Sequence, residues 1–257
     1  NFNHSRSAKH RIMRNCPYYV ALFLIVSVLA LPAGAQDSDV GAFVEFLLED
    51  DERFEEVAFA EVVEAVSGCK MLPVDLSASV DQFMLQAIEV ALDQILTDLS
   101  DPEDPIHAIK RINETSRVIE DRLLKALNTA GGLVCSFPAN ASGELQRSGY
   151  PDLRLLHEAS GRVFYIDPKV YKSGSEQSSF RTFYFEPQGE TNKILDNASH
   201  LIVGMSHAGK VDDRWIFETW QIVDLVDFKV RLKAEFQASN KDLYQKSAVL
   251  RRSGRDD

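Results

Sequence analysis

The chain has 257 residues, 45% of them hydrophobic, which is enough for one large or two small domains with a buried core. Its formal net charge is −11, and the acids are unevenly spread: residues 36–130 hold 22 acidic against 7 basic side chains, whereas residues 131–257 hold 17 of each. This balance argues against a basic nucleic-acid-binding domain in the first half and leaves the second half able to carry a local basic groove. The absence of P-loop, GxSxG, HExxH and paired CxxC motifs excludes the enzyme classes that those motifs mark.

Residues 1–35 have the layout of a secretory signal peptide. Four basic residues and no acid precede the apolar run VALFLIVSVLAL, and a small-residue cleavage site, Ala-Gly-Ala, follows at residues 33–35. The apolar run is short for a bilayer span, so we expect export to the periplasm or the medium and no stable membrane insertion after cleavage. An uncleaved anchor is the alternative, and a protein that does not use the signal stays in the cytoplasm.

Residues 36–104 are predicted to form an acidic helical region. Apolar positions recur every three or four residues over 39–67, which predicts a helix that ends at Gly68, and again over 78–99. The stretch DLSDPEDP then breaks the pattern with two prolines. We expect these helices to cover the core, with a dimerisation face as the alternative.

Residues 105–245 are expected to form the α/β core. A third helix is predicted over 106–128, with Ile112, Ile119 and Leu123 on one face. Short strands are predicted after it, at 133–137, 153–158, 162–170, 179–186, 200–206 and 214–222, with a further ambiguous strand at 230–236 and a capped helix at 238–247. Residues 246–257 are expected to be a disordered tail. Helices followed by strands predict an α+β fold, in which N-terminal helices precede a mixed sheet with flanking helices.

The cysteine content leaves two alternatives open. Cys16 lies in the expected signal peptide, so Cys69 and Cys135 remain in the mature chain. In an exported protein they can form a disulfide, and as buried thiols they need no partner.

The stretch SGYPDLRLLHEASGRVFYIDPKVYKSG is predicted to be a hairpin that carries two carboxylates and a lysine. Asp167 and Lys169 are two residues apart on one strand, so their side chains point to the same face. A two-residue turn at 159–160 puts Asp152 across from Asp167, whereas a turn at 160–161 puts it across from Lys169. Either register brings Asp152 to that same face.

Two carboxylates and an ammonium group on one patch suit phosphodiester hydrolysis. The acids can hold Mg²⁺ through oxygen ligands, and a substrate phosphate completes the octahedral shell. The metal stabilises the attacking and leaving oxygens, while the lysine orients the water or offsets charge on the phosphate. The alternative is that Asp167 and Lys169 form a surface ion pair, which contributes little to stability.

Pro151-Asp152 followed by Asp167-Pro168-Lys169 resembles the active-site signature of the PD-(D/E)XK nuclease superfamily, which includes many type II restriction endonucleases. The resemblance covers about residues 105–245, in the order helix, hairpin, further strands. It implies a restriction-endonuclease-like fold and a Mg²⁺-dependent endodeoxyribonuclease that acts on DNA, with a homodimer as a possible assembly. Pro168 lacks a donor for the strand ladder, so its place is expected at an edge or with its nitrogen facing outward.

The resemblance also implies roles for individual residues. Asp152 and Asp167 correspond to the metal ligands and Lys169 to the catalytic lysine. Many members add a glutamate from the preceding helix, and Glu120 is the best candidate because it borders the apolar face of that helix; Glu144 is another option. The competing hypothesis is an exported, non-catalytic binding or structural protein on an α+β scaffold.

Overall fold

The computed structural model describes residues 41–45, 56–178, 183–186, 189–232 and 237–251. The chain divides into two compact units, residues 1–48 and 49–257. In the first unit only the helical residues 41–45 are described, and the expected signal peptide lies outside the described residues.

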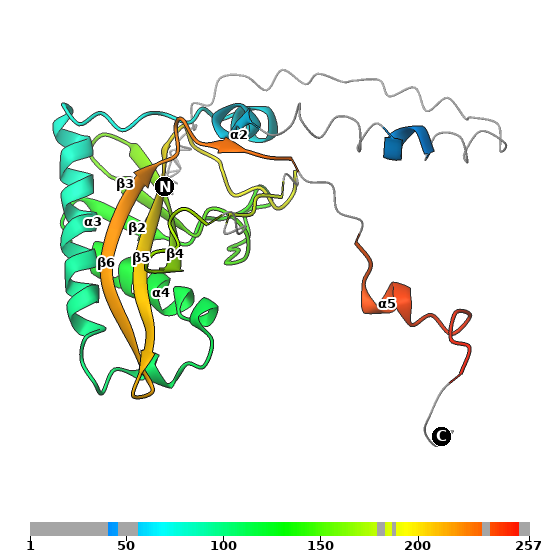
Figure 1. Cartoon of the computed structure of the whole chain (residues 1–257). Coiled ribbons are helices and arrows are strands. Elements are labelled where there is room, and N and C mark those ends of the chain that lie inside the picture. The colour runs from blue at the N-terminus through cyan, green and yellow to red at the C-terminus, as the bar shows by residue number, and fades with distance from the viewer. Residues whose placement is uncertain (1–40, 46–55, 179–182, 187–188, 233–236, 252–257) are drawn as a thin grey trace, which may run out of the picture. The chain divides into compact units, whose positions relative to one another are not determined.

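A five-stranded mixed sheet forms the centre of this unit (Figure 1). In order across the sheet its strands are β2 (Leu133–Ser136), β3 (Leu153–His157), β4 (Arg162–Lys172), β5 (Ser199–Val211) and β6 (Arg214–Asp224). β4 and β5 run parallel, and every other neighbouring pair is antiparallel. A separate two-stranded sheet pairs β1 (Val57–Ala58) with β7 (Lys229–Val230).

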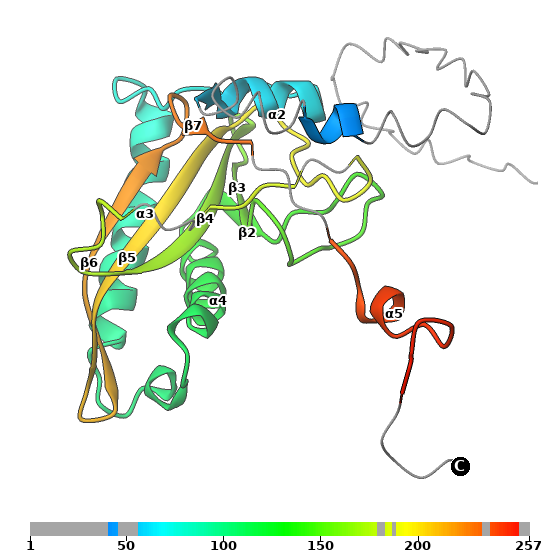
Figure 2. The same cartoon turned by 45° about the vertical axis from the view of Figure 1, so that its right-hand side comes forward.

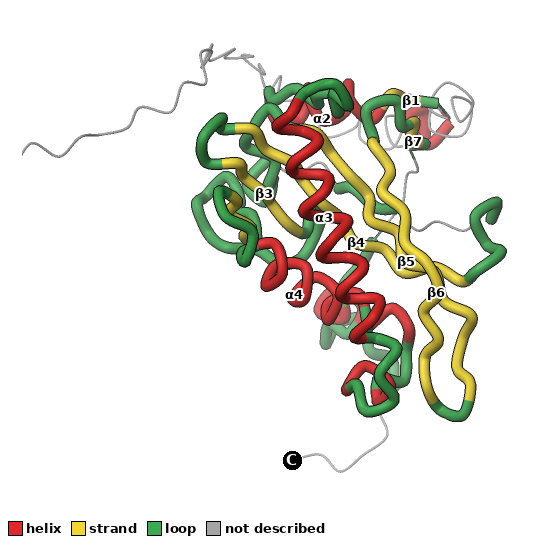
Figure 3. The backbone as a smooth tube through the Cα atoms, turned by 90° about the vertical axis from the view of Figure 1, so that its left-hand side faces the viewer, coloured by secondary structure: helices red, strands yellow, loops and turns green. Residues whose placement is uncertain are grey.

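The helices are short except for one. They are α2 (Phe59–Ser67), α3 (Ser79–Asp98), α4 (Ser116–Leu127) and α5 (Asn240–Leu243), with 3-10 turns η2 (Pro105–Ala108) and η3 (Ile112–Glu114). The helix predicted over 39–67 is not continuous: residues 57–58 form β1, α2 begins at Phe59, and residues 46–55 lie outside the described part. Its end is as predicted, because Gly68 adopts a φ of 70° and its N–H caps the carbonyl of Glu64. α3 and α4 lie over one face of the sheet (Figures 2 and 3).

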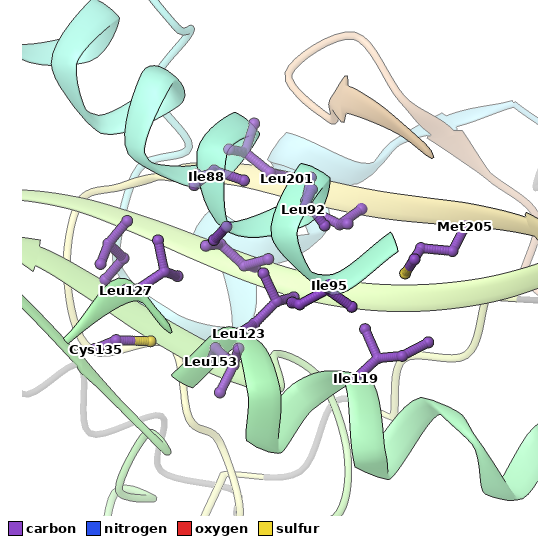
Figure 4. Close-up of a cluster of buried hydrophobic side chains, with 14 of the residues drawn as sticks. Ile88, Leu92, Ile95, Ile119, Leu123, Leu127, Cys135, Leu153, Leu201 and Met205 are labelled. Atoms are coloured by element: carbon purple, nitrogen blue, oxygen red, sulfur yellow. The ribbon is translucent and has the colours of Figure 1, made fainter. Parts of the chain in front are cut away.

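The main hydrophobic core lies between that face and the two helices (Figure 4). Alternate residues of each strand point into it, as the two-residue period of a strand requires. From the helices come Ile88, Leu92, Ile95, Ile119, Leu123 and Leu127; from the strands come Cys135, Leu153, Leu155, Phe164, Ile166, Leu201, Val203 and Met205. This packing fixes which residues of β3 and β4 face the other way.

A second cluster covers part of the opposite face. Phe59 of α2 is its fully buried centre and makes edge-to-face contacts with Tyr150, Phe183 and Phe185. Val163 and Tyr165 contribute the intervening positions of β4. β4 therefore belongs to both clusters, and its side chains alternate between them.

The third helix is shorter than predicted. Residues 106–115 do not continue α4 toward the N-terminus, and they form two 3-10 turns separated by extended residues. The carbonyls of His107 and Ile109 accept hydrogen bonds from Lys210 Nζ (3.0 Å) and Trp215 Nε1 (2.9 Å) of the β5–β6 hairpin. The apolar residues of 106–115 have helical spacing, but carbonyl groups that would accept helical hydrogen bonds accept them from β5 and β6 instead.

The strand predictions are confirmed for β2 to β6 and corrected in two places. Residues 183–186 form no strand; Phe183 and Phe185 pack into the second cluster, and residues 179–182 lie outside the described part. The ambiguous last strand is reduced to β7, and residues 233–236 lie outside the described ranges. The cap of the helix predicted over 238–247 is confirmed, since Ser239 and Asp242 form a capping box, but the helix is shorter than predicted, because α5 ends at Leu243.

Two further expectations concern the cysteines and the membrane. Cys69 lies in the second cluster and Cys135 in the main core, and no disulfide joins these two described residues. Within the ranges that the structure describes, no helix has the length and apolar character to cross a bilayer. The α+β prediction, with helices before a mixed sheet, is confirmed.

Candidate active site

The predicted hairpin is present, and its register sets the position of the first acid. Leu153 pairs with Ile166 and His157 with Arg162, so continuing the ladder by one residue places Asp152 opposite Asp167. This is one of the two registers that the sequence allowed. The loop, however, has four residues, 158–161, and Gly161 closes it with a φ of 72°.

Asp167 and Lys169 share the face of β4 that lies opposite the main core. At this point β4 extends beyond the end of β3. Its ladder with β3 ends at Ile166, whereas its parallel ladder with β5 continues to Lys172. Pro168 has no backbone N–H, and on the β3 side of the sheet no described strand pairs with it, so no hydrogen bond is lost on that side. The proline lies in a strand at the middle of the sheet, at a point where that strand has a partner on one side only.

The two aspartates interact strongly. Asp167 is buried, with 2% of its surface exposed, and Asp152 is half-buried beside it. Burial, the negative charge of Asp167 and a hydrogen bond to it together raise the pKa of Asp152 to about 8, although Lys169 acts in the opposite direction. At neutral pH and without a cation the pair therefore retains a proton between its two carboxyl groups.

Lys169 provides the nearest positive charge. Its Nζ lies 2.6 Å from Asp167 Oδ2, and its side chain keeps 35% of its surface exposed. The lysine thus contacts the acid pair and remains accessible from solvent. Asp152, Asp167 and Lys169, which were predicted to share a face, are brought together.

Glu120 lies on α4, next to the core residue Ile119. Burial raises its pKa, which the ion pair with Arg147 (3.3 Å) partly opposes, and Asp167 is close enough to repel it. Arg147 also pairs with Asp121 at 2.9 Å. Glu120 therefore belongs to the same electrostatic cluster as the two aspartates, whereas the alternative Glu144 is exposed in the loop before the hairpin.

Two comparisons with known proteins bear on this arrangement. The profile of the Type II restriction enzyme MjaV family matches residues 53–247. The chain belongs to this restriction enzyme family. It is also 29% identical over 210 residues to the Type II restriction enzyme MjaV of Methanocaldococcus jannaschii, an alignment that covers 76% of this chain and 88% of that protein.

Membership of the restriction enzyme family makes the chain a nuclease that acts on DNA. The matched range begins before α2 and ends after α5, so it includes both hydrophobic clusters and the hairpin. Part of the predicted acidic helical region, including α3, is thus within the family match. The competing hypothesis of a non-catalytic exported protein gains no support from the comparisons.

The acid pair has the donor set that a hard divalent cation needs in a restriction enzyme. Asp167 Oδ2 is buried, and it contacts the Lys169 ammonium group at 2.6 Å. The carboxylate oxygens of the pair are ligands of the kind that a hard divalent cation prefers, and the proton retained by Asp152 is one that such a cation would displace. Within the described ranges no three His, Cys, Asp or Glu side chains are close enough to form a complete metal site, so protein ligands would come from the pair.

Lys193 is a member of this site that the sequence analysis missed. It lies in the segment before β5 and is only 1% exposed, and its ammonium group is within electrostatic reach of Asp152, Asp167 and Glu120. A single lysine in a polar loop is usually solvated. Nothing in the sequence "ETNKILDN" distinguishes it; only the packing shows that it is buried.

Tyr150 and His200 form the buried wall beside Asp152. The Tyr150 hydroxyl lies 2.7 Å from His200 Nδ1, and both side chains are buried. Burial, and then the charges of Asp167 and Asp152, raise the pKa of Tyr150, while burial lowers that of His200 to about 3. Both rings are therefore neutral at physiological pH and give the acid pair an environment of low polarity on this side.

Proposed function

We propose that the protein is a Mg²⁺-dependent endodeoxyribonuclease whose centre is formed by Asp152, Asp167 and Lys169. The observation that carries the proposal is the convergence of two coupled carboxylates and a partly exposed lysine on one hairpin. Membership of a restriction enzyme family supplies the substrate class, DNA, and the bond to be cut, the phosphodiester.

The chain's own groups have separate tasks in this proposal. Asp152 and Asp167 would hold the cation, and Asp152 would release its retained proton on binding it. Lys169 would hold the attacking water in line and offset negative charge on the phosphate. The water oxygen forms the new P–O bond, the P–O bond to the leaving sugar oxygen breaks, and a proton of the water passes through solvent to that oxygen. Glu120 adds negative charge beside the pair. The bound Mg²⁺ supplies Lewis-acid stabilisation of the charge that develops on the phosphoryl oxygens.

The first test removes the ammonium group. Lys169→Ala is expected to reduce plasmid nicking in Mg²⁺ by at least about a hundredfold, because both water orientation and charge compensation are lost. Lys172→Ala, at the exposed end of the same strand, is the matched control and should cut like the wild type. The site assignment fails if Asp167→Ala cleaves at the wild-type rate.

We also propose that the enzyme acts as a homodimer, since cutting both strands of a duplex in one event requires two centres. The apolar surface of α3 is available for such an interface, with 63% of Val90 and 39% of Phe83 exposed. Light scattering at micromolar concentration should give twice the mass of the mature chain. A monomer mass in the presence of DNA would contradict the proposal.

A further inference from the structure

Lys193 is the one fully buried lysine among the described residues. It is 1% exposed, in the same range as the core leucines. Its one hydrogen bond within the described part of the chain runs from Nζ to the carbonyl of Gln146, at 3.3 Å. An ammonium group has three donors, so this contact leaves most of its hydrogen-bonding capacity unused.

The burial of this charge needs compensation, and the acid cluster provides part of it. Burial lowers the pKa of Lys193, and the charges of Asp152, Asp167 and Glu120, in that order, raise it again. Lys169 repels it, so two lysines approach the same acids from different segments. Lys169 is partly exposed and pairs directly with Asp167, whereas Lys193 is inaccessible and acts on the whole cluster.

We propose that Lys193 is a built-in counter-cation: it holds the three carboxylates together while the metal is absent, and it lowers the affinity of the site for divalent cations. This inference rests on the proposed function, because it takes Asp152 and Asp167 as the metal ligands. In this proposal Lys193 is a positioning residue, because it is buried and acts through the acids.

The sign of the expected effect follows from Coulomb's law. Removing a buried positive charge strengthens the attraction of the acids for any cation, so the metal binds more tightly. The proton on Asp152 also binds more tightly, but it carries one charge and the metal carries two. The binding free energy of the metal therefore improves by more than that of the proton that it displaces. The apparent metal affinity of the variant is thus expected to rise.

The test is calorimetric titration of the full-length protein with Mn²⁺ and with Ca²⁺, without DNA. Lys193→Met, which keeps the length of the side chain, should bind on the order of tenfold more tightly than the wild type. Lys193→Arg, which keeps the charge, should stay within about twofold. Lys125→Met removes an exposed lysine from α4 and should leave the affinity unchanged.

Thermal stability gives a second readout. The metal-free Lys193→Met protein should melt below the wild type, and saturating Mn²⁺ should raise its melting temperature by more than it raises that of the wild type, because ligand binding stabilises by linkage. If the lysine only fills space, the variant is destabilised equally with and without metal, and the inference fails. If Lys193→Met is too unstable to purify, Glu120→Gln/Lys193→Met should recover stability, and a double variant that does not recover overturns the inference.

Failure of the inference and failure of the proposed function are separable. Asp167→Asn tests the ligands: if the wild type binds Mn²⁺ and this variant binds it equally well, the proposed site is wrong. If Asp167→Asn abolishes binding but Lys193→Met leaves the affinity unchanged or weakens it, only the counter-cation role is wrong. Weaker DNA binding by Lys193→Met at unchanged metal affinity would instead mark a phosphate contact, which also overturns it.

Discussion

At the scale of single residues, the proposed centre combines charges that oppose one another. Asp152 and Asp167 repel each other, and burial raises the cost of ionising them further. The sequence predicted that these two acids and Lys169 share a face, because strand geometry alone decides that. It could not predict the buried Lys193, since burial of a loop residue depends on how distant segments pack.

The pKa of Asp152 has a consequence for stability without metal. An acid with a raised pKa keeps its proton in the folded state at a pH where the unfolded chain has lost it, so stability falls as pH rises from about 4 toward about 8. Asp152→Asn should therefore be more stable than the wild type by at least about 1 kcal/mol at pH 8. The difference should shrink toward pH 5.

Urea unfolding in EDTA at the two pH values measures this difference. Glu120 also has a raised pKa and contributes with the same sign in both proteins, so the comparison isolates Asp152. A wild type as stable as Asp152→Asn at pH 8 would show that the two carboxylates are not coupled.

At the scale of elements, α3 is attached to the sheet by a buried ion pair. Arg162, the first residue of β4, binds both oxygens of Asp81 at 2.8 and 2.9 Å. Arg162 also donates to Ser199 Oγ of β5 at 2.6 Å. Burial opposes the ionisation of Asp81, but the hydrogen bonds from Arg162 and from the backbone of Asp75 outweigh it and lower its pKa. The pair connects the start of the helix to two strands.

Breaking this pair should destabilise the whole protein. Asp81→Asn leaves the Arg162 guanidinium buried without its counter-charge, so we expect a loss of about 3 kcal/mol in the free energy of unfolding. Glu89→Gln, on the exposed side of the same helix, is the matched control and should change stability by less than about 0.5 kcal/mol. A similar small effect of Asp81→Asn would mean that the helix is held by apolar packing alone.

Elements with a clear local sequence pattern were predicted better than the segment whose conformation depends on distant contacts. α3 and the strands β2 to β6 were predicted within two residues at each end, except that β5 continues to Val211, five residues beyond its predicted end. The helix over 106–128 was predicted ten residues too long at its start. There the isoleucines have helical spacing, but Trp215 and Lys210 bind the backbone carbonyls, and such distant contacts leave no local signal.

At the scale of the whole molecule, one strand joins two hydrophobic clusters. Phe164 and Ile166 of β4 point into the main core, while Val163 and Tyr165 point into the cluster around Phe59. Neither cluster can lose its packing without exposing β4. The described part of residues 49–257 should therefore unfold as one unit.

This cooperativity can be checked with one substitution in each cluster. Leu123→Ala and Phe59→Ala should each lower the free energy of unfolding by about 3 to 4 kcal/mol, because both side chains are fully buried. Tryptophan fluorescence and far-UV circular dichroism should report the same midpoint for both variants. Leu145→Ala, at a residue 76% exposed, is the control. Two separate transitions in Phe59→Ala would show that the second cluster unfolds on its own.

The four-residue loop at the end of the hairpin has a consequence for recognising distant relatives. The two aspartates are 15 positions apart because five ladder pairs and one loop separate them, and the ladder alone keeps the acids opposite each other. A relative could gain or lose residues in this loop and keep an identical centre. Searches for such enzymes should therefore hold the strand lengths fixed and let the interval between the acids vary.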